Sequence, residues 1–378
     1  MTAVRLLKNG SEAFPAMSGA VDRAASSVAL EMYIFADDET GREFQRRLVA
    51  AAARGVQVMV LLDAWGSRSL PDGFWDDLRS HGGMVRSFHP LSRGLFPFRN
   101  HRKLLLVDDR IAYLGGMNIA DEYYRGLRGE PPWRDNMVEI TGTEVVQLRH
   151  SFSRMWGRAD SPLRRLMLRL SRNRRMKGIP GGKVRFLESG PENPVRPVRR
   201  AYRQVIQTAA KNIDLAMGYF YPNGRLLRTL RRAVRRGVRV RLLFSRKTDV
   251  PIARWAARGL YGRLLRAGVE VWEYEPAMMH AKLAIADDTV IAGSANLDIR
   301  SGRINYELVA VATDASLAAR ARADFEDDLK SSARVLFADW RKRSLIQKLK
   351  ERFSYCLLAR ADIFIARTQM GRMRRRKD

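Results

Sequence analysis

The chain has 378 residues, of which 46% are hydrophobic, so it is long enough to bury the cores of two ordinary domains. Lysine and arginine outnumber aspartate and glutamate by 69 to 40, which gives a formal net charge of +29. This excess predicts a polyanionic partner, either nucleic acid or an anionic lipid surface, although an arginine-rich genome would account for part of it. The single cysteine, Cys356, excludes an intramolecular disulfide and a metal site built from cysteines.

Neither a signal peptide nor a transmembrane helix is expected. Residues 1–30 contain no long apolar run, and no stretch of about 18 uncharged apolar residues occurs in the chain. We therefore expect a protein that is soluble or lies on a membrane surface.

The first part of the chain alternates between strand and helix patterns. The predicted elements are a strand at 28–35, a helix at 39–53, a strand at 56–62, a helix near 72–80 and a strand near 84–88. Arg54-Gly55 is a typical end for the first of these helices. This alternation predicts an α/β architecture of buried parallel strands joined by right-handed crossovers.

One short motif occurs twice in the chain. It consists of His, one residue, Lys, four residues and Asp, followed by two small residues and Asn. The first copy is His101, Lys103, Asp108, Gly116 and Asn118; the second is His280, Lys282, Asp287, Ser294 and Asn296. The histidines lie 179 residues apart and the asparagines 178, so we interpret the motif as a duplicated half-site.

The scaffold around the second copy repeats the first. Its predicted elements are a strand at 212–220, a helix at 224–235, a strand at 238–244, a helix at 252–267 and a strand at 269–274. The main difference is the segment from Pro90 to His101, which is longer than that from Pro276 to His280. We expect this insertion to form a flap over the site.

Each copy of the motif offers an imidazole, a fixed cation and an amide, a set that suits one face of a phosphodiester. Side chains at i and i+2 of a strand point to the same face, so the histidine and lysine should project together. Small residues at Gly116 and Ser294 let a ligand approach the backbone. Two copies suffice for phosphoryl transfer without a metal or cofactor: one histidine attacks phosphorus and the other moves protons. The lysines and asparagines would stabilise the negative charge.

Each histidine needs a partner that fixes its tautomer, usually a carboxylate. The candidates are Asp135 and Glu307, which follow their histidines by 34 and 27 residues, each at or just before a predicted strand. Asp108 and Asp287 complete the catalytic motif, but they stand where a turn should follow the motif strand. We expect structural roles for these two.

Two strongly basic segments lie outside the repeated halves. Residues 161–183 carry leucines and a methionine on one helical face among arginines and lysines, with no acid. The tail from residue 341 has 13 basic residues against three acidic ones, with apolar patches between them. Both compositions suit helices at a membrane interface, and both also suit helices that pack on their own domain. The predicted parts are lobe 1–160, linker 161–183, lobe 184–335 and tail 336–378.

The doubled motif resembles that of the phospholipase D superfamily, and three stretches resemble the bacterial cardiolipin synthases within it. These stretches are residues 33–41, residues 100–103, and residues 293–301 followed by Asn305 and Glu307. The resemblance implies a duplicated α/β fold: two α/β/α sandwich lobes, related by a pseudo-twofold axis, with one shared active site. It also implies a phosphatidyl-enzyme intermediate on His101, with His280 as acid and base. The family reaction joins two phosphatidylglycerol molecules into cardiolipin and releases glycerol.

The chain departs from the common family pattern at Gly116 and in its lack of N-terminal transmembrane helices. We expect a monomer, bound peripherally at the cytoplasmic side of a bacterial cell membrane, with an anionic phospholipid as substrate and no nucleic acid partner. Two alternatives use the same chemistry: hydrolysis of a phospholipid, and a nuclease on the same scaffold. Lipid transfer is favoured over the nuclease because the cations lie among Leu, Ile and Phe.

Overall fold

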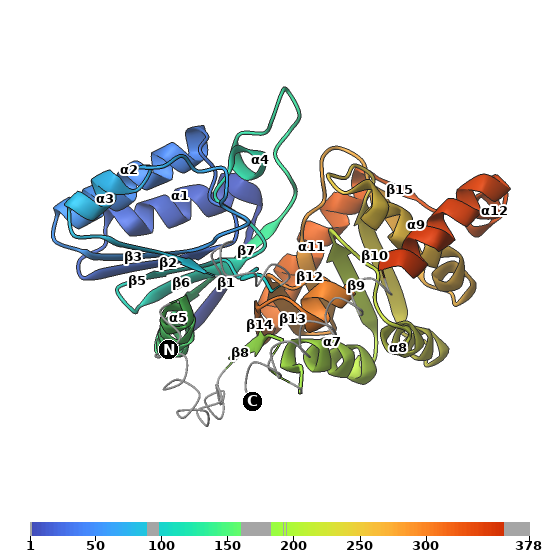
Figure 1. The fold of residues 1–378 in the computed structure, drawn as a ribbon. Helices are drawn as coiled ribbons and strands as arrows, with labels where there is room; N and C mark the ends of the chain where they lie inside the picture. The colour runs from blue at the N-terminus through green and yellow to red at the C-terminus, as the bar shows by residue number, and fades with distance from the viewer. Residues whose placement is uncertain (1, 89–97, 160–182, 192, 194, 359–378) are drawn as a thin grey trace, which may run out of the picture. The chain divides into compact units, whose positions relative to one another are not determined.

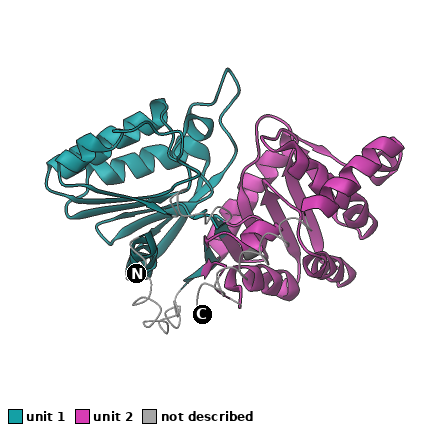
Figure 2. Cartoon of the chain, in the orientation of Figure 1, with its two compact units in different colours: residues 1–187, 292–294, 308–312 teal, residues 188–291, 295–307, 313–378 magenta. Residues whose placement is uncertain are grey.

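The structure is a computed structural model that describes residues 2–88, 98–159, 183–191, 193 and 195–358 (Figure 1). The chain divides into two compact units (Figure 2). Unit 1 is residues 1–187 with the short segments 292–294 and 308–312, and unit 2 is the remainder.

A mixed sheet of seven strands forms the centre of unit 1, in the order β1-β7-β6-β5-β2-β3-β4. Its strands are β1 (Ala3–Lys8), β2 (Ser27–Met32), β3 (Gln57–Asp63), β4 (Met84–Phe88), β5 (Leu104–Val107), β6 (Ile111–Gly115) and β7 (Asn136–Thr141). The strands β2, β3 and β4 pair in parallel, whereas β5, β6, β7 and β1 extend the sheet by antiparallel pairing. The parallel half predicted from the apolar runs is confirmed.

Helices cover both faces of this sheet (Figure 1). They are α1 (Asn9–Asp22), α2 (Glu39–Ala53), α3 (Asp76–Ser80), α4 (Asp121–Tyr124) and α5 (Val145–Ala159). The helices α1 and α2 bury Phe14, Phe44 and Leu48 in a core with the apolar side chains of β2 and β3. The helix α5 packs on β4, β5 and β6 from the other face. This two-sided cover explains why β2 and β3 read as nearly continuous apolar runs.

A second sheet has eight strands in the order β15-β11-β10-β9-β12-β13-β14-β8. They are β8 (Val184–Ser189), β9 (Asn212–Met217), β10 (Arg239–Ser245), β11 (Glu270–Tyr274), β12 (Lys282–Ala286), β13 (Thr289–Gly293), β14 (Glu307–Thr313) and β15 (Ser332–Arg334). The helices are α7 (Pro197–Thr208), α8 (Gly224–Arg235), α9 (Pro251–Arg266), α10 (Ile299–Arg303), α11 (Ala315–Lys330) and α12 (Phe337–Arg341).

The two sheets repeat one topology. The strands β8 to β14 stand in the same relative order as β1 to β7, and β15 is an addition at the edge beside β11. A parallel bridge between Phe35 and Ile119 has its counterpart between Phe220 and Leu297. The duplicated α/β fold expected from the doubled motif is therefore confirmed.

Local sequence signals placed several elements accurately. The predicted helices 39–53 and 224–235 match α2 and α8 at both ends, and each is followed by a glycine at positive φ, Gly55 at 86° and Gly237 at 87°. The predicted strands 28–35 and 212–220 are too long, because β2 and β9 end at Met32 and Met217. Beyond these ends the chain leaves the sheet and runs beside the motif histidines.

Some predicted segments lie outside the described residues. The predicted flap segment, Pro90 to His101, is described only from residue 98 onward, and the basic linker falls within 160–182 apart from Lys183. The tail is described to residue 358, with α12 followed by a helix over residues 345–358. Within the described ranges, no helix combines the length and the hydropathy needed to span a membrane.

Candidate active site

The first motif copy lies where β2 ends beside the start of β5. Glu31 near the end of β2 is opposite Leu104, so the chain following β2 meets the residues that precede β5. The ring of Tyr33 contacts that of His101 edge-on, with 4.9 Å between centroids. The Nζ atom of Lys103 donates a hydrogen bond to the carbonyl of His101 (2.8 Å) and lies 5.0 Å from the Tyr33 ring centroid. The lysine is buried, so its ammonium is held against the histidine rather than in bulk solvent.

Two buried carboxylates hold the segment around His101. Asp63, at the end of β3, accepts a hydrogen bond from the backbone N–H of Asn100 (2.8 Å). Glu31 accepts one from the Asn100 side chain (2.8 Å) and forms an ion pair with Arg102 (3.1 Å). Burial raises the pKa of Asp63 even though backbone N–H groups, including that of Asn100, act in the opposite direction. These contacts fix the backbone on both sides of His101 before any substrate binds.

Glu31 and Asp63 were not recognised from the sequence. Both stand in otherwise apolar strand runs, Val-Ala-Leu-Glu31-Met and Met-Val-Leu-Leu-Asp63. A charged residue within a strand that is buried on both faces needs a partner, since an isolated buried carboxylate is costly. That signal would have been sufficient to identify them.

The second motif copy has a similar arrangement at the start of β12. The Nζ atom of Lys282 lies 2.7 Å from Nδ1 and 3.0 Å from Nε2 of His280, and it also donates to the His280 carbonyl. The backbone N–H of Met279 donates to Ser245 Oγ (2.8 Å) at the end of β10, the position that Asp63 occupies in the first copy.

Close backbone approach shapes the second copy. A Cβ atom on Gly218 would lie 3.0 Å from Cα of His280, so a larger residue there would displace the histidine. The next residue, Tyr219, faces His280 edge-on with 6.1 Å between ring centroids. In the first copy Tyr33 alone contacts the motif histidine at this point, whereas in the second copy Gly218 and Tyr219 share this role.

The two motif asparagines differ in their bonding. The Asn118 side chain donates to the hydroxyl of Tyr123 (2.8 Å) and accepts from the backbone N–H of Ile34 (3.1 Å), so these two hydrogen bonds fix the orientation of its amide. The Oδ1 atom of Asn296 is buried and has no hydrogen-bond partner among the described residues. A buried acceptor left without a partner costs roughly 1–3 kcal/mol, so this amide is suited to accept a hydrogen bond from a bound molecule.

The candidate orienting carboxylates occupy equivalent places in the two sheets. Gly116 N donates to the carbonyl of Asn136 (3.1 Å), and Ser294 N donates to that of Leu308 (3.0 Å). Asp135 and Glu307 each immediately precede these carbonyl residues and are fully buried. The structure therefore brings one buried carboxylate to the same position beside each motif.

The departure from the family pattern at Gly116 has a steric cause. A Cβ atom at this position would lie 2.4 Å from Oδ1 of Asp135 and 2.6 Å from Oδ2. In the second copy, Ser294 has room for its side chain, and its Oγ accepts a hydrogen bond from Leu308 N (3.0 Å). Glycine at 116 is thus the residue that allows the Asp135 carboxylate to lie against the motif.

Asp108 and Asp287 lie at the far ends of β5 and β12 from the histidines. The Asp108 carboxylate accepts hydrogen bonds from the N–H groups of Ala25, Ser26 and Ser27 at 2.7–2.9 Å, and one from the Ser26 hydroxyl. Partial burial opposes ionisation, but these hydrogen bonds prevail and lower the pKa of Asp108 to about 2.

The Asp287 carboxylate makes the equivalent contacts with the N–H groups of Ala210, Lys211 and Asn212 at 2.7–2.9 Å. Its pKa is also lowered, because the backbone hydrogen bonds outweigh the opposing effect of burial. Both aspartates adopt positive φ, 52° and 47°. These contacts tie the end of each motif strand to the start of its neighbour and place both carboxylates away from the imidazoles.

The family model described as "Cardiolipin synthase, PLD-like domain" matches residues 17–156 and 202–329. Cardiolipin synthase 1 of Bacillus cereus is 32% identical over 364 residues, which cover 93% of this chain and 71% of that protein. Cardiolipin synthase A of Pseudomonas putida is 35% identical over 360 residues, covering 93% and 73%. Among solved structures, phosphatidylserine synthase of Haemophilus influenzae is similar in fold, with a TM-score of 0.74, 14% identity, and coverage of 96% and 94%.

Proposed function

The chain belongs to the cardiolipin synthase family of phospholipase D-like phosphatidyltransferases, and we propose that it joins two phosphatidylglycerol molecules into cardiolipin, releasing glycerol. The observation that carries the proposal is that both copies of the motif are complete, each with a buried lysine that hydrogen-bonds to its histidine carbonyl. A protein that only bound lipid would have no need of two such histidine–lysine pairs. The catalytic set we propose is His101, Lys103, His280 and Lys282.

In the first half of the reaction, Nε2 of His101 attacks the phosphorus of one phosphatidylglycerol. A P–N bond forms and the P–O bond to the headgroup glycerol breaks. His280 gives its proton to the departing alkoxide, so glycerol leaves as a neutral alcohol. The phosphatidyl group is then carried on His101 as a phosphohistidine, and His280 is neutral.

In the second half, neutral His280 takes the proton from a headgroup hydroxyl of the second phosphatidylglycerol. That oxygen attacks phosphorus, the P–N bond to His101 breaks, and cardiolipin is released. His101 and His280 return to their starting protonation states. Water in place of the second lipid would give phosphatidic acid, so exclusion of water decides between transfer and hydrolysis.

The remaining site residues stabilise charge and orient the histidines. The ammonium groups of Lys103 and Lys282 and the side-chain N–H groups of Asn118 and Asn296 would donate to the non-bridging oxygens, whose charge grows in the transition state. We assign Gly116 and Ser294 to close backbone approach of the same phosphate. Two fixed lysines supply the cations for which many phosphoryl-transfer enzymes use a metal, so we propose that the reaction is metal-independent.

Asp135 and Glu307 would accept a hydrogen bond from Nδ1–H of their histidines, which leaves Nε2 free for attack or proton transfer. Their complete burial and equivalent positions support this role. We further propose that the protein works as a monomer, peripherally bound at the cytoplasmic side of the membrane, with anionic phospholipid and no nucleic acid as its partner.

The test uses purified full-length protein and phosphatidylglycerol vesicles in the presence of EDTA. Cardiolipin and glycerol should appear in equal amounts, detected by mass spectrometry. His101→Ala and His280→Ala should each lower the rate at least about 1000-fold, because each removes a group needed in both half-reactions. His81→Ala, which changes an exposed histidine outside the motif, is the matched control and should be fully active.

Three results would refute parts of the proposal. If phosphatidic acid forms and cardiolipin does not, the enzyme hydrolyses phosphatidylglycerol instead of transferring the phosphatidyl group. If the protein cleaves DNA in EDTA and forms no lipid product, its substrate is nucleic acid instead of lipid. Activity that is lost in EDTA and restored by a divalent cation would contradict the metal-independent mechanism.

A further inference from the structure

The helix over residues 345–358, which we call the tail helix, packs on unit 2 through polar side chains and through Tyr355 and Leu358, which contact a small buried apolar cluster. Glu351 is buried and forms ion pairs with Arg258 of α9 (3.2 Å) and with Arg343. Lys350 lies over the ring of Trp255, 3.5 Å from its centroid. Tyr355 donates a hydrogen bond to the carbonyl of Pro222 (3.2 Å). These contacts fix one face of the helix against α9 and the start of α8.

The opposite face of the tail helix is apolar and exposed. Its large side chains and their exposed fractions are Leu345 76%, Ile346 79%, Leu349 67%, Phe353 67% and Leu357 41%. At 100° per residue these five positions fall on one side of the helix, away from Glu351. A surface helix of a globular protein normally buries its apolar side and exposes its charges. The tail helix instead exposes these five apolar side chains, and an exposed apolar stripe of this size is typical of an interaction surface.

Cations border this stripe. Lys348, Lys350 and Arg352 stand on its two flanks, by the same helical geometry. A lipid-interface helix has this composition: large apolar side chains that enter the boundary between headgroups and acyl chains, and lysine or arginine beside them.

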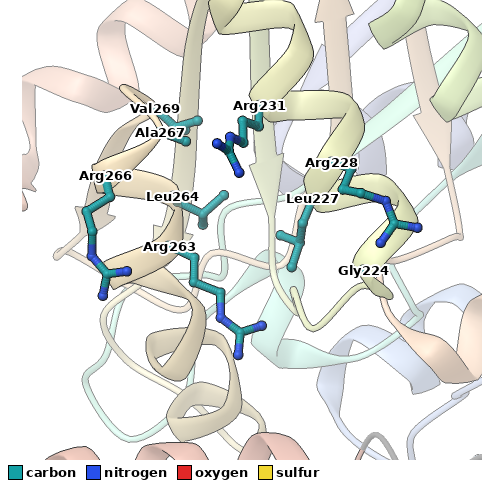
Figure 3. Close-up of a pocket in the computed structure, with 9 residues that line it drawn as sticks. All are labelled: Gly224, Leu227, Arg228, Arg231, Arg263, Leu264, Arg266, Ala267 and Val269. Carbon is teal, nitrogen blue, oxygen red and sulfur yellow. The ribbon is translucent and has the colours of Figure 1, made fainter.

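A cavity of about 460 Å³ lies close by, between α8 and α9 (Figure 3). Its apolar lining includes Leu227, Leu264 and Val269. Four exposed arginines line it: Arg228, Arg231, Arg263 and Arg266. None of the four forms an ion pair with a carboxylate within the described ranges of the chain. Gly224 at its edge is two residues from Pro222, which Tyr355 contacts, so the cavity adjoins the tail helix.

We propose that the tail helix and the adjoining arginine cavity form a docking surface for an anionic phospholipid bilayer. The apolar stripe inserts at the boundary of the acyl chains, and the four arginines receive the phosphate headgroups of neighbouring lipids. Charge complementarity selects this partner over a second copy of the chain, because bringing two such arginine clusters together would be repulsive. It also selects the bilayer over residues 359–378, whose seven basic and two acidic residues would repel the same arginines.

The choice of lipid rests on the proposed function, but the docking surface itself does not depend on catalysis. It goes beyond the substrate site, since none of its residues belongs to the motif. Its role would be to keep the enzyme at the surface where its two lipid substrates are concentrated.

The first experiment measures binding of the full-length protein to sucrose-loaded vesicles by sedimentation, with phosphatidylglycerol or with phosphatidylcholine alone. Leu349→Gln/Phe353→Gln should lower the partition coefficient on phosphatidylglycerol vesicles about 100-fold, since two large apolar side chains no longer enter the lipid. Val146→Gln/Val195→Gln is the matched control. These two valines lie outside the tail helix and are 46% and 47% exposed, against 67% for Leu349 and Phe353, and binding should be unchanged.

A second pair of variants tests the arginine cavity. Arg228→Gln/Arg231→Gln should weaken binding to phosphatidylglycerol vesicles about 30-fold, since each cation near an anionic surface contributes substantially. Arg46→Gln/Arg110→Gln removes the same net charge from exposed positions of unit 1 and should change binding less than about threefold. Equal losses from both pairs would show that only total charge matters and would overturn the role of the cavity.

Other outcomes would overturn the docking surface. If the Leu349→Gln/Phe353→Gln variant sediments with phosphatidylglycerol vesicles as the wild type does, the apolar stripe is not the contact with the bilayer. A wild-type dimer in light scattering that this variant converts to a monomer would make the stripe an interface between copies. A His101→Ala/His280→Ala variant that still sediments would show that docking stands even if the proposed reaction fails. Cardiolipin synthesis by a wild type that does not sediment would leave the reaction standing and reject the docking surface.

Discussion

Asp108 gives the sharpest test of the division between structural and chemical residues in the motif. In Asp108→Asn the side chain keeps one acceptor oxygen and tolerates the positive φ of 52°, so the backbone is not strained. The amide nitrogen, however, faces the N–H of Ala25, where Oδ2 now accepts a hydrogen bond at 2.9 Å. We expect unit 1 to lose stability while the chemistry is almost unchanged.

The pKa of Asp108 sets the size of the effect. It is about 2 in the folded protein, against an ordinary value of 3.8. Such a shift corresponds to about 2.5 kcal/mol, and solvent screening at this partly exposed site reduces it to about 1–1.5 kcal/mol. Because the folded-state pKa is depressed, this stability is fully present above pH 4. It should be lost progressively as the pH falls from about 4 to about 2.

The assay is calorimetric unfolding at pH 7 together with the turnover rate. Asp108→Asn should lower the transition temperature by about 2–6 °C and change kcat less than about threefold. Asp287→Asn, with its equivalent contacts, should behave similarly in unit 2. Asp109→Asn is the matched control, because this adjacent carboxylate is half exposed and forms an ion pair with Arg149 instead of the backbone contacts of Asp108.

The reasoning would be refuted by an Asp108→Asn protein that unfolds as the wild type does but loses about 100-fold in kcat. That result would show that the Asp108 carboxylate takes part in the reaction rather than only stabilising the fold. A stability loss that persisted undiminished down to pH 2 would contradict the assignment of the effect to ionisation.

Two further predictions concern the site and the tail. Gly116→Ala places a methyl group 2.4 Å from Oδ1 of Asp135, so the carboxylate must move; kcat should fall about 10- to 100-fold with a cost in stability of about 1–3 kcal/mol. Ser294→Ala, which loses hydrogen bonds without a clash, should cost about 1 kcal/mol, and full activity of Gly116→Ala would remove Asp135 from its proposed role. Glu351→Gln leaves the partly buried Arg258 with Glu273 as its remaining carboxylate, so the tail helix should detach more easily by about 1–3 kcal/mol, measured as faster hydrogen exchange over residues 345–358. Lys350→Gln, which loses only an exposed contact with Trp255, should accelerate exchange far less, and equal acceleration in both variants would contradict the anchoring role of Glu351.

Much of the fold could be predicted from sequence because the signals for it are local. The spacing of apolar residues and the Arg54-Gly and Arg236-Gly pairs placed α2 and α8 to the residue. The doubled motif revealed the duplication, since a repeated supersecondary unit keeps its spacing wherever it is placed. The candidate motif residues could be named for the same reason.

Other features depend on residues far apart in the chain. Asn100 is held by hydrogen bonds to Glu31 and Asp63, which are 69 and 37 positions away in the sequence. No local sequence pattern connects these residues to Asn100. Glycine at 116 is explained only by the position of Asp135, which a Cβ atom would meet.

The tail shows the same division most clearly. Its sequence indicated a basic amphipathic segment, but an amphipathic pattern does not say which face the protein covers. The tertiary structure decided this, because Arg258 and Trp255 on α9 provide partners for Glu351 and Lys350. These contacts hold the Glu351 face against α9, and the face that carries Leu345, Ile346 and Leu349 is turned outward.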